Sequence, residues 1–431
     1  MTFWRLKPLQ EARSKENGRS LLALVFFFFF AHALFSSPLF GQGMPLDSIS
    51  ENNHNPAIVA SQDGVRVFAV WDGWVKGEKR IIFRESVAGE WLPDIPLDED
   101  TVRENFAPTI ALDGEDNPYV AWITKTPHGD SIYLTFRIGE VWATPREIFV
   151  SHDELLTCES VSLAVAHTYP PQAWLTWQAV RSGHYSIFAA TFLLNGGECQ
   201  TWEVSSLLPS MSYQVFPQLL LQRFTPYIVW YVATEGSEFV PLCAKYDSNQ
   251  NNWTLVSDNS LLAALPGNRL PQIVWRDSTP AEAELTPLVG AYWCDQTPSG
   301  NQVFAVLPTT FDSDSTLSVI RSDNPDGSQS QTRNVSAVIP PDTVGQMILT
   351  WSALSPTGGA HIWCASLQEK DTCDGIQPRV ISKDGPPTFY TSPAVCATPT
   401  DIHIVYLSDA EHGGNGHVYY AKLPRRSKDN K

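Results

Sequence analysis

The sequence is poor in cysteine and has no cysteine spacing that would frame a small disulfide-rich fold. Its 431 residues include seven cysteines, an odd number, and none shows the C-x2-C spacing of a zinc site. The hydrophobic core must therefore stabilise the chain. Cys364 and Cys373, close together in an expected hairpin, form the one pair for which we predict a disulfide in an oxidising compartment.

Sequence motifs of catalysis are also missing. The chain holds no G-x-S-x-G, no phosphate-cradling glycine loop and no H-E-x-x-H. The acidic stretches 113–117 and 312–315 offer the oxygen ligands that calcium prefers, but neither fits an EF-hand loop. A tight turn also explains the first stretch, so we predict no cofactor, with calcium as the alternative.

Basic residues are outnumbered, with 29 lysines and arginines against 46 aspartates and glutamates. Residues 1–42 hold five basic and two acidic side chains, so the rest of the chain has 24 against 44, a net charge of −20. Such a surface repels nucleic acid and anionic membrane. The expected partners are a carbohydrate or protein ligand, bound by a monomer.

Long apolar runs are absent except at residues 21–35, which follow a basic N-terminal stretch. This run is shorter than the roughly twenty residues that span a bilayer as a helix. A cationic stretch before a short apolar run is typical of a secretory signal, and an uncleaved anchor is the alternative. We predict a signal peptide over 1–42, a mature domain over 43–424 without a membrane span, and a polar tail over 425–431. The protein is then secreted, periplasmic or at the cell surface.

A repeat is what the sequence does contain. Each copy begins with a proline or small residue, runs through an apolar strand and a turn, and reaches an aromatic residue on a second strand. The seven aromatic residues, spaced by 51 to 63 positions, are Trp71, Trp122, Trp177, Trp230, Trp293, Trp351 and Tyr406. A third strand follows each of them, and a fourth begins near a tryptophan in several copies. Four antiparallel strands per copy predict one β-propeller blade each.

The two ends of the chain predict how the ring closes. The seventh copy stops after its third strand, at Leu423, while residues 44–52 resemble residues 95–105, which precede the second copy. An N-terminal strand therefore completes the last blade and removes an exposed edge. The predicted fold is all-β: a seven-bladed β-propeller of four-stranded antiparallel blades.

The fifteen tryptophans raise the alternatives of core packing and sugar stacking. A large aromatic residue at a fixed strand position fills the wedge between tilted sheets, so we predict that the strand tryptophans belong to the core. Aromatic residues in loops, such as Trp74 and Tyr185, stay available for a ligand.

The ligand face is expected where the loops between blades meet the loops between second and third strands. Its candidate residues are Asp72, Trp74, Arg103, Glu104, His128, His184, Arg269, Arg333 and His412. The three histidines each adjoin a glycine at similar places in three blades. They are either converging metal ligands or general bases, or else exposed turn residues. Loop carboxylates can act as a glycosidase pair only at a suitable separation.

One stretch carries a family resemblance. The residues Pro108-Thr109-Ile110-Ala111-Leu112-Asp113-Gly114, followed by Tyr119-Val120-Ala121-Trp122 and Ile132-Tyr133, resemble the blades of exported bacterial propellers of the sialidase-like, BNR-repeat group. The resemblance extends over nearly the whole mature chain as a pattern. The Asp-boxes of that group, S-x-D-x-G-x-T-W, do not occur here, so the resemblance implies the fold and supplies no catalytic residue.

Three functions are compatible with these observations. The first is an exported propeller that binds a glycan, peptide or protein partner on its loop face without catalysis. The second is a glycoside hydrolase or polysaccharide lyase that uses loop carboxylates, and the third is a structural scaffold. The missing catalytic motifs favour the first.

Overall fold

The structure is a computed structural model. It describes residues 43–98, 103–151, 156–194, 199–208, 213–222, 224–233, 238–256, 270–276, 288–297, 300–310, 319–322, 332–343, 346–354, 359–368, 378–382, 389–408 and 416–425. The chain divides into two units, Met1–Phe40 and Gly41–Lys431, and the first lies outside the described residues. The predicted signal peptide therefore stays a prediction. Within the described part, no helix has the length and apolar character needed to cross a membrane.

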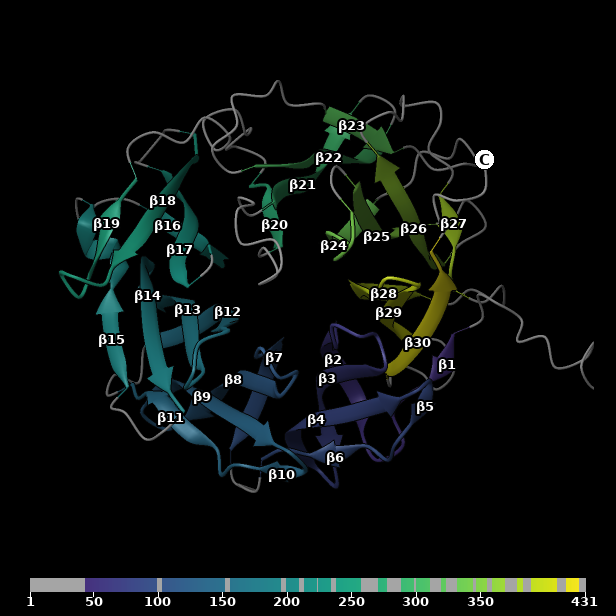
Figure 1. Cartoon of the computed structure of the whole chain (residues 1–431), viewed down its shortest axis with the longest axis horizontal. Helices are drawn as coiled ribbons and strands as arrows, with labels where there is room; N and C mark the ends of the chain where they lie inside the picture. The colour runs from purple at the N-terminus through teal and green to yellow at the C-terminus, as the bar shows by residue number, and fades with distance from the viewer. Residues whose placement is uncertain are drawn as a thin grey trace, which may run out of the picture. The chain divides into compact units, whose positions relative to one another are not determined.

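Seven antiparallel sheets form the blades of the second unit and stand around a central channel (Figure 1). Blade 1 is β2(Glu51–Ala60), β3(Arg66–Val75), β4(Glu78–Val87), β5(Glu90–Trp91) and β6(Ile95–Pro96). Blade 2 is β7(Glu104–Leu112), β8(Pro118–Thr126), β9(Gly129–Ile138), β10(Val141–Trp142) and β11(Arg146–Phe149). In these two blades two short strands pair with the third strand, so the outer strand is split.

The other blades have four strands each. Blade 3 is β12(Leu156–Ala166), β13(Gln172–Arg181), β14(His184–Leu193) and β15(Gln200–Glu203), and blade 4 is β16(Tyr213–Gln222), β17(Thr225–Ala233), β18(Val240–Asp247) and β19(Asn252–Leu255). Blade 5 is β20(Gln272–Arg276), β21(Leu288–Thr297), β22(Gly300–Thr310) and β23(Val319–Ser322), and blade 6 is β24(Thr332–Val338), β25(Gln346–Leu354), β26(Ala360–Gln368) and β27(Arg379–Val380). Blade 7 is β28(Tyr390–Ala397), β29(Asp401–Ser408), β30(His417–Pro424) and β1(Met44–Pro45). The described helix is a single 3-10 turn, η1(Val204–Leu207).

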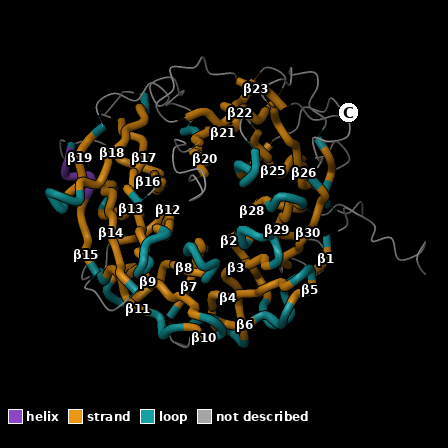
Figure 2. Tube along the Cα trace, in the orientation of Figure 1, coloured by secondary structure: helices purple, strands orange, loops and turns teal. Residues whose placement is uncertain are grey.

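The innermost strand of each blade is the first one in the sequence, so β2, β7, β12, β16, β20, β24 and β28 enclose the channel (Figure 2). The repeated aromatic residue lies on the second strand of every blade and is at most 7% exposed. It packs in the apolar layers between blades, as the clusters around Trp71, Trp122 and Trp230 show. The prediction that the strand tryptophans belong to the core is confirmed.

The N-terminal strand closes the ring, as the sequence predicts. Met44 pairs with Tyr420 in β30, just as Ile95 pairs with Phe83 in blade 1. Leu46 continues this pairing through a 2.7 Å hydrogen bond from its N–H to the carbonyl of Val418. Its side chain is fully buried. The likeness between residues 44–52 and 95–105 thus corresponds to the same strand register in two blades.

Candidate functional site: the channel mouth

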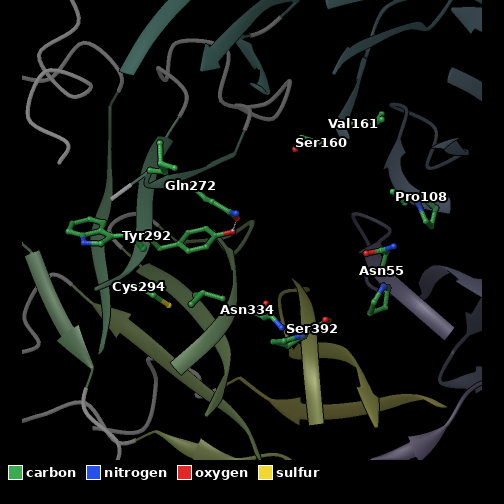
Figure 3. A pocket seen from close by; sticks show the side chains of 15 residues that line it. Asn55, Pro108, Ser160, Val161, Gln272, Tyr292, Cys294, Asn334 and Ser392 are labelled. Carbon is green, nitrogen blue, oxygen red and sulfur yellow. Dashed lines mark hydrogen bonds between the residues drawn. The ribbon is translucent and has the colours of Figure 1, made fainter. Parts of the chain in front are cut away.

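A cavity of about 810 Å³ opens where the inner strands meet (Figure 3). We call it the channel-mouth cavity. Its lining comes from blades 1, 2, 3, 5, 6 and 7 and consists of Asn55, Pro56, Ala107, Pro108, Ser160, Val161, Leu270, Gln272, Tyr292, Trp293, Cys294, Asn334, Val335, Ser392 and Pro393. These residues are far apart in the sequence, and the ring of blades brings them together.

The lining is built from one backbone feature that repeats in every blade. One residue of each inner segment has a positive φ, between 47° and 55°, and a proline or valine follows it. These seven residues are Asn55, Ala107, Ser160, Phe216, Leu270, Asn334 and Ser392. In six blades the residue sits at a register shift of the inner strand, a β-bulge, and in blade 5 it precedes β20. A bulge bends the strand and redirects a side chain, and six of the seven residues line the channel-mouth cavity. We call the seven residues the bulge ring.

Neighbouring blades hold the bulge ring in place. The carboxylate of Asp72 in blade 1 accepts hydrogen bonds from the Asn55 side chain, at 2.8 Å, and from the Ala107 N–H of blade 2, at 3.1 Å. Gln178, at the same repeat position in blade 3, accepts the Phe216 N–H of blade 4 at 3.0 Å. In blades 1 and 3 the residue after the repeat aromatic therefore holds the bulge of the next blade.

None of the fifteen lining residues carries a charge at neutral pH. Burial raises the pKa of Tyr292 above its ordinary value and the pKa of the Cys294 thiol to about 11, so both stay protonated. The Tyr292 hydroxyl donates to Oε1 of Gln272 at 2.7 Å, as the dashed line in Figure 3 shows. The cavity thus offers amides and hydroxyls that can both donate and accept hydrogen bonds.

Three neighbouring members of the bulge ring carry polar side chains. Blades 6, 7 and 1 contribute Asn334, Ser392 and Asn55 in succession, and all three labelled side chains lie along one side of the cavity in Figure 3. Blades 4 and 5, across the channel, contribute Phe216 and Leu270. Polar groups of blades 6, 7 and 1 thus lie together along one side of the cavity, and blades 3 and 5 add further polar groups to the lining.

A smaller cleft of about 220 Å³ lies beside blades 1 and 2, lined by Asp98, Arg103, Asn105, Trp122, Thr124, Tyr133, Thr144 and Pro145. Arg103 donates to the Tyr133 hydroxyl, and that hydroxyl donates to Glu147. Burial and then the Glu147 carboxylate raise the pKa of Tyr133 to about 12, so its hydroxyl is a poor nucleophile. Below them the buried pair of Asp98 and Arg80, 2.7 Å apart, belongs to the blade structure.

The predicted site residues lie at different positions in the ring of blades. None of those described lines the channel-mouth cavity. Asp72 is fully buried, and Lys79 Nζ lies 3.0 Å from its carboxylate, so its place is structural. Trp74 is half-buried on β3, and Glu104 forms an exposed pair with Lys125 at 3.8 Å. Arg103 lines the smaller cleft.

The histidines do not form a metal site in the described part of the chain. His128 is exposed in a turn of blade 2 and His184 is exposed at the start of β14 in blade 3, and no group of three or more His, Cys, Asp or Glu residues among the described ones could hold a metal ion. The carboxylate of Asp113 accepts N–H bonds from Glu115 and Asn117, each at 2.9 Å, which is the geometry of a tight turn.

Several predictions lie outside the described residues. Arg269, His412 and Cys373 fall there, as do the acidic stretch 312–315 and the side chain of Arg333. Cys364 is buried in β26. The disulfide between Cys364 and Cys373 and the alternative of calcium binding therefore stay predictions.

Sequence reasoning missed the bulge ring although a signal for it exists. Five of the seven residues directly precede the proline that opens a repeat, as in Asn55-Pro56 and Ser392-Pro393. The proline marks the repeat, but the residue before it changes chemically from blade to blade. A search for repeats therefore treats the residue before the proline as a variable position without a role, although this position faces the channel.

No family model matches the chain, and no curated protein matches it. Solved structures similar to it include Trypanosoma rangeli sialidase, at 11% identity and a TM-score of 0.45, with 88% of this chain and 57% of that chain covered. The β-propeller domain of the Trilobed protease from Pyrococcus furiosus is 8% identical, with a TM-score of 0.46 and coverage of 89% and 100%. An endo-arabinase from Bacteroides thetaiotaomicron VPI-5482 is 14% identical, with a TM-score of 0.36 and coverage of 63% and 95%. This chain spans just over half the length of the sialidase.

Proposed function

We propose that this protein is an exported propeller that binds an uncharged glycan in the channel-mouth cavity and does not cleave it. The observation that carries the proposal is the lining itself, in which amides and hydroxyls face the cavity and charged side chains are absent among the fifteen residues. A sugar presents a rim of hydroxyl groups that such side chains can bind in both hydrogen-bonding directions. The volume lies within the range of ligand pockets.

The same lining argues against the hydrolase alternative. Glycoside hydrolysis ordinarily requires two carboxyl groups that flank the scissile bond, and none of the fifteen described lining residues is an aspartate or glutamate. Recognition of an acidic sugar ordinarily relies on guanidinium groups, and none of these fifteen described residues is an arginine. Neutral glycans are therefore the favoured ligand class.

A glycan array and a panel of glycosidase substrates test the proposal on protein that begins at Gly43. The protein should be produced without N-glycosylation, because Asn334 belongs to the sequon Asn334-Val335-Ser336. We expect binding of neutral glycans without turnover. Release of any sugar would show that the protein is an enzyme, and an array without signal would refute glycan binding.

Glycine variants of the bulge ring link binding to the cavity. Asn334→Gly and Ser392→Gly remove one hydrogen-bonding side chain each at positions of positive φ, which glycine tolerates. Each should weaken binding by about tenfold, the equivalent of one good hydrogen bond. The matched control is Ala88→Gly, which has a φ of 51° in the turn after β4, at the other end of its blade. This variant should bind like the unmodified protein.

A further inference from the structure

Three aromatic side chains on blades 3 and 4 lie outside the core. Phe216 and Tyr213, both on β16, are 44% and 45% exposed. The ring centroid of Tyr185, at the start of β14, lies 6.1 Å from that of Tyr213, with the ring planes tilted by 52°. None of the three belongs to the apolar clusters of the described residues. We call them the aromatic track.

The track leads from the channel to the loop face. Phe216 is the blade 4 member of the bulge ring, equivalent to the six members that line the cavity. Tyr213 lies three residues earlier, about 10 Å along an extended strand, where β16 begins. Tyr185 pairs with Val180 near the turn that joins β13 and β14, at the same face. The Tyr213 and Tyr185 rings therefore contact each other at the loop face, three residues along β16 from the Phe216 position.

The backbone holds the inner end of the track rigidly. The Phe216 N–H donates to Gln178, and Pro217 fixes the next backbone angle. A phenyl ring on fixed backbone loses little conformational freedom when a ligand packs on it. Single exposed aromatic side chains are common on protein surfaces and need no explanation. Several that lie in succession near a cavity form a larger apolar surface, and such a surface marks a site for a ligand.

We infer that the ligand is a chain, namely a neutral oligosaccharide whose first unit occupies the channel-mouth cavity and whose following units pack on Phe216, Tyr213 and Tyr185. This inference rests on the proposed function. A sugar ring has apolar C–H faces as well as hydroxyl groups, and a flat aromatic ring packs against such a face without requiring charge. The fifteen described lining residues and the three residues of the track are uncharged, which favours one neutral ligand.

Calorimetric titration with gluco-, manno- and xylo-oligosaccharides of one to six units tests the inference. For the sugar that binds, we expect affinity to rise by about tenfold or more from one unit to four. Tyr213→Ala and Tyr185→Ala should keep the affinity for the single unit and lose this gain with length. Phe216→Ala should lose it as well. The matched control is Phe224→Ala, whose side chain is 59% exposed in the turn between β16 and β17, at the opposite end of blade 4.

The outcomes separate this inference from the proposed function. If the affinity still rises with oligosaccharide length in all three variants, the aromatic track does not bind the ligand. Glycan binding in the cavity would then still stand. Tighter binding of a proline-rich peptide to the same three residues also overturns it, since such peptides dock on aromatic grooves. If no sugar of any length binds, both proposals fail together.

Discussion

At the scale of single residues, the position after the repeat aromatic determines how one blade meets the next. Asp72 and Gln178 occupy it in blades 1 and 3 and accept backbone N–H groups from blades 2 and 4. Tyr231 occupies it in blade 4 and donates to the Pro271 carbonyl of blade 5. Three different side chains thus make the same kind of contact between neighbours.

Replacement of Asp72 by alanine should lower the free energy of unfolding by about 3 kcal/mol, because it leaves a buried N–H and the Lys79 ammonium without their acceptor. Urea denaturation measures this change. Glu104→Ala is the matched control, since its carboxylate is 54% exposed and its pair with Lys125 spans 3.8 Å. It should change stability by less than about 0.5 kcal/mol. Equal effects of the two substitutions would contradict the structural place of Asp72.

His403 should make stability depend on pH. The imidazole is 3% exposed, and burial lowers its pKa from 6.5 to about 4. In the unfolded chain the His403 imidazole therefore takes up a proton below about pH 6.5, whereas in the folded chain it does so only near pH 4. The free energy of unfolding therefore decreases as the pH falls from about 6.5 to about 4. The expected loss between pH 7 and pH 5 is about 2 kcal/mol. Urea unfolding at both pH values should show this loss in the parent protein and not in His403→Gln. Parallel losses in the two proteins would refute the prediction.

At the scale of strands and blades, a buried ion pair joins blades 1 and 2. Arg137 on β9 lies 2.6 Å from Glu85 on β4, and both side chains are 6% exposed. The guanidinium group also lies between 5.6 and 5.8 Å from the ring centroids of Phe68, Phe83 and Trp142. The pair therefore lies within an otherwise aromatic layer.

Glu85→Gln should destabilise the protein by about 3 kcal/mol, because the buried guanidinium loses its counter-charge. The double substitution Glu85→Leu with Arg137→Met should recover most of this loss, since apolar side chains of similar volume suit the aromatic layer. Thermal and urea unfolding of the single and double variants form the test. A double variant less stable than Glu85→Gln would show that the charges themselves stabilise the interface.

The blades could be predicted from the sequence because each one repeats the same physical requirements. An inner strand, a turn and a buried aromatic residue recur, so Trp71 and Trp122 align by eye. The hydrogen bonds from a backbone N–H to a carboxylate beside the outer strand also recur. The carboxylates of Asp47 and Asp98 accept the N–H groups of Val418 and Ile81, at 3.2 and 3.4 Å. The split outer strands of blades 1 and 2 were not predicted, because strands of two to four residues leave little pattern.

The site could not be predicted in the same way. A side chain such as Asp72 stands on the expected face, yet the contact with blade 2 buries it, and one strand's sequence does not encode that contact. The cavity instead uses positions such as Ala107 and Ser392, whose residue types suggest no chemistry. Their importance comes from a positive φ, which only the folded backbone displays.

At the scale of the whole molecule, the N-terminal segment ties blade 7 to blade 1. Strand β1 pairs with β30, while the Ser48 N–H donates to Asp94 of blade 1 at 2.8 Å and Arg84 donates to the Leu46 carbonyl. Trp91 of blade 1 also packs edge-on against Tyr420, with ring centroids 4.9 Å apart. The two ends of the described chain are thus held by both neighbouring blades.

Deletion of residues 43–54 should sharply lower the melting temperature, because it removes the outer strand of blade 7 and the buried Leu46 side chain. Hydrogen exchange should accelerate first in β30, whose pairing partner is lost, and last in β9. Substitution of Gly43 tests the same segment more gently, since a Cβ atom there would lie 1.8 Å from the buried Tyr406 hydroxyl. An unchanged melting temperature for both variants would refute the closure.

We expect that the side chains of the bulge ring can be substituted without a change of the fold. Its seven side chains project from positions where the blade needs a backbone angle rather than a particular residue, and asparagine, alanine, serine, phenylalanine and leucine already occupy them. Under the proposed function, folding and ligand preference are therefore encoded in separate parts of the sequence. A library that varies the members Asn334, Ser392 and Phe216 tests whether selectivity changes while the tryptophan core and the closing strand remain untouched.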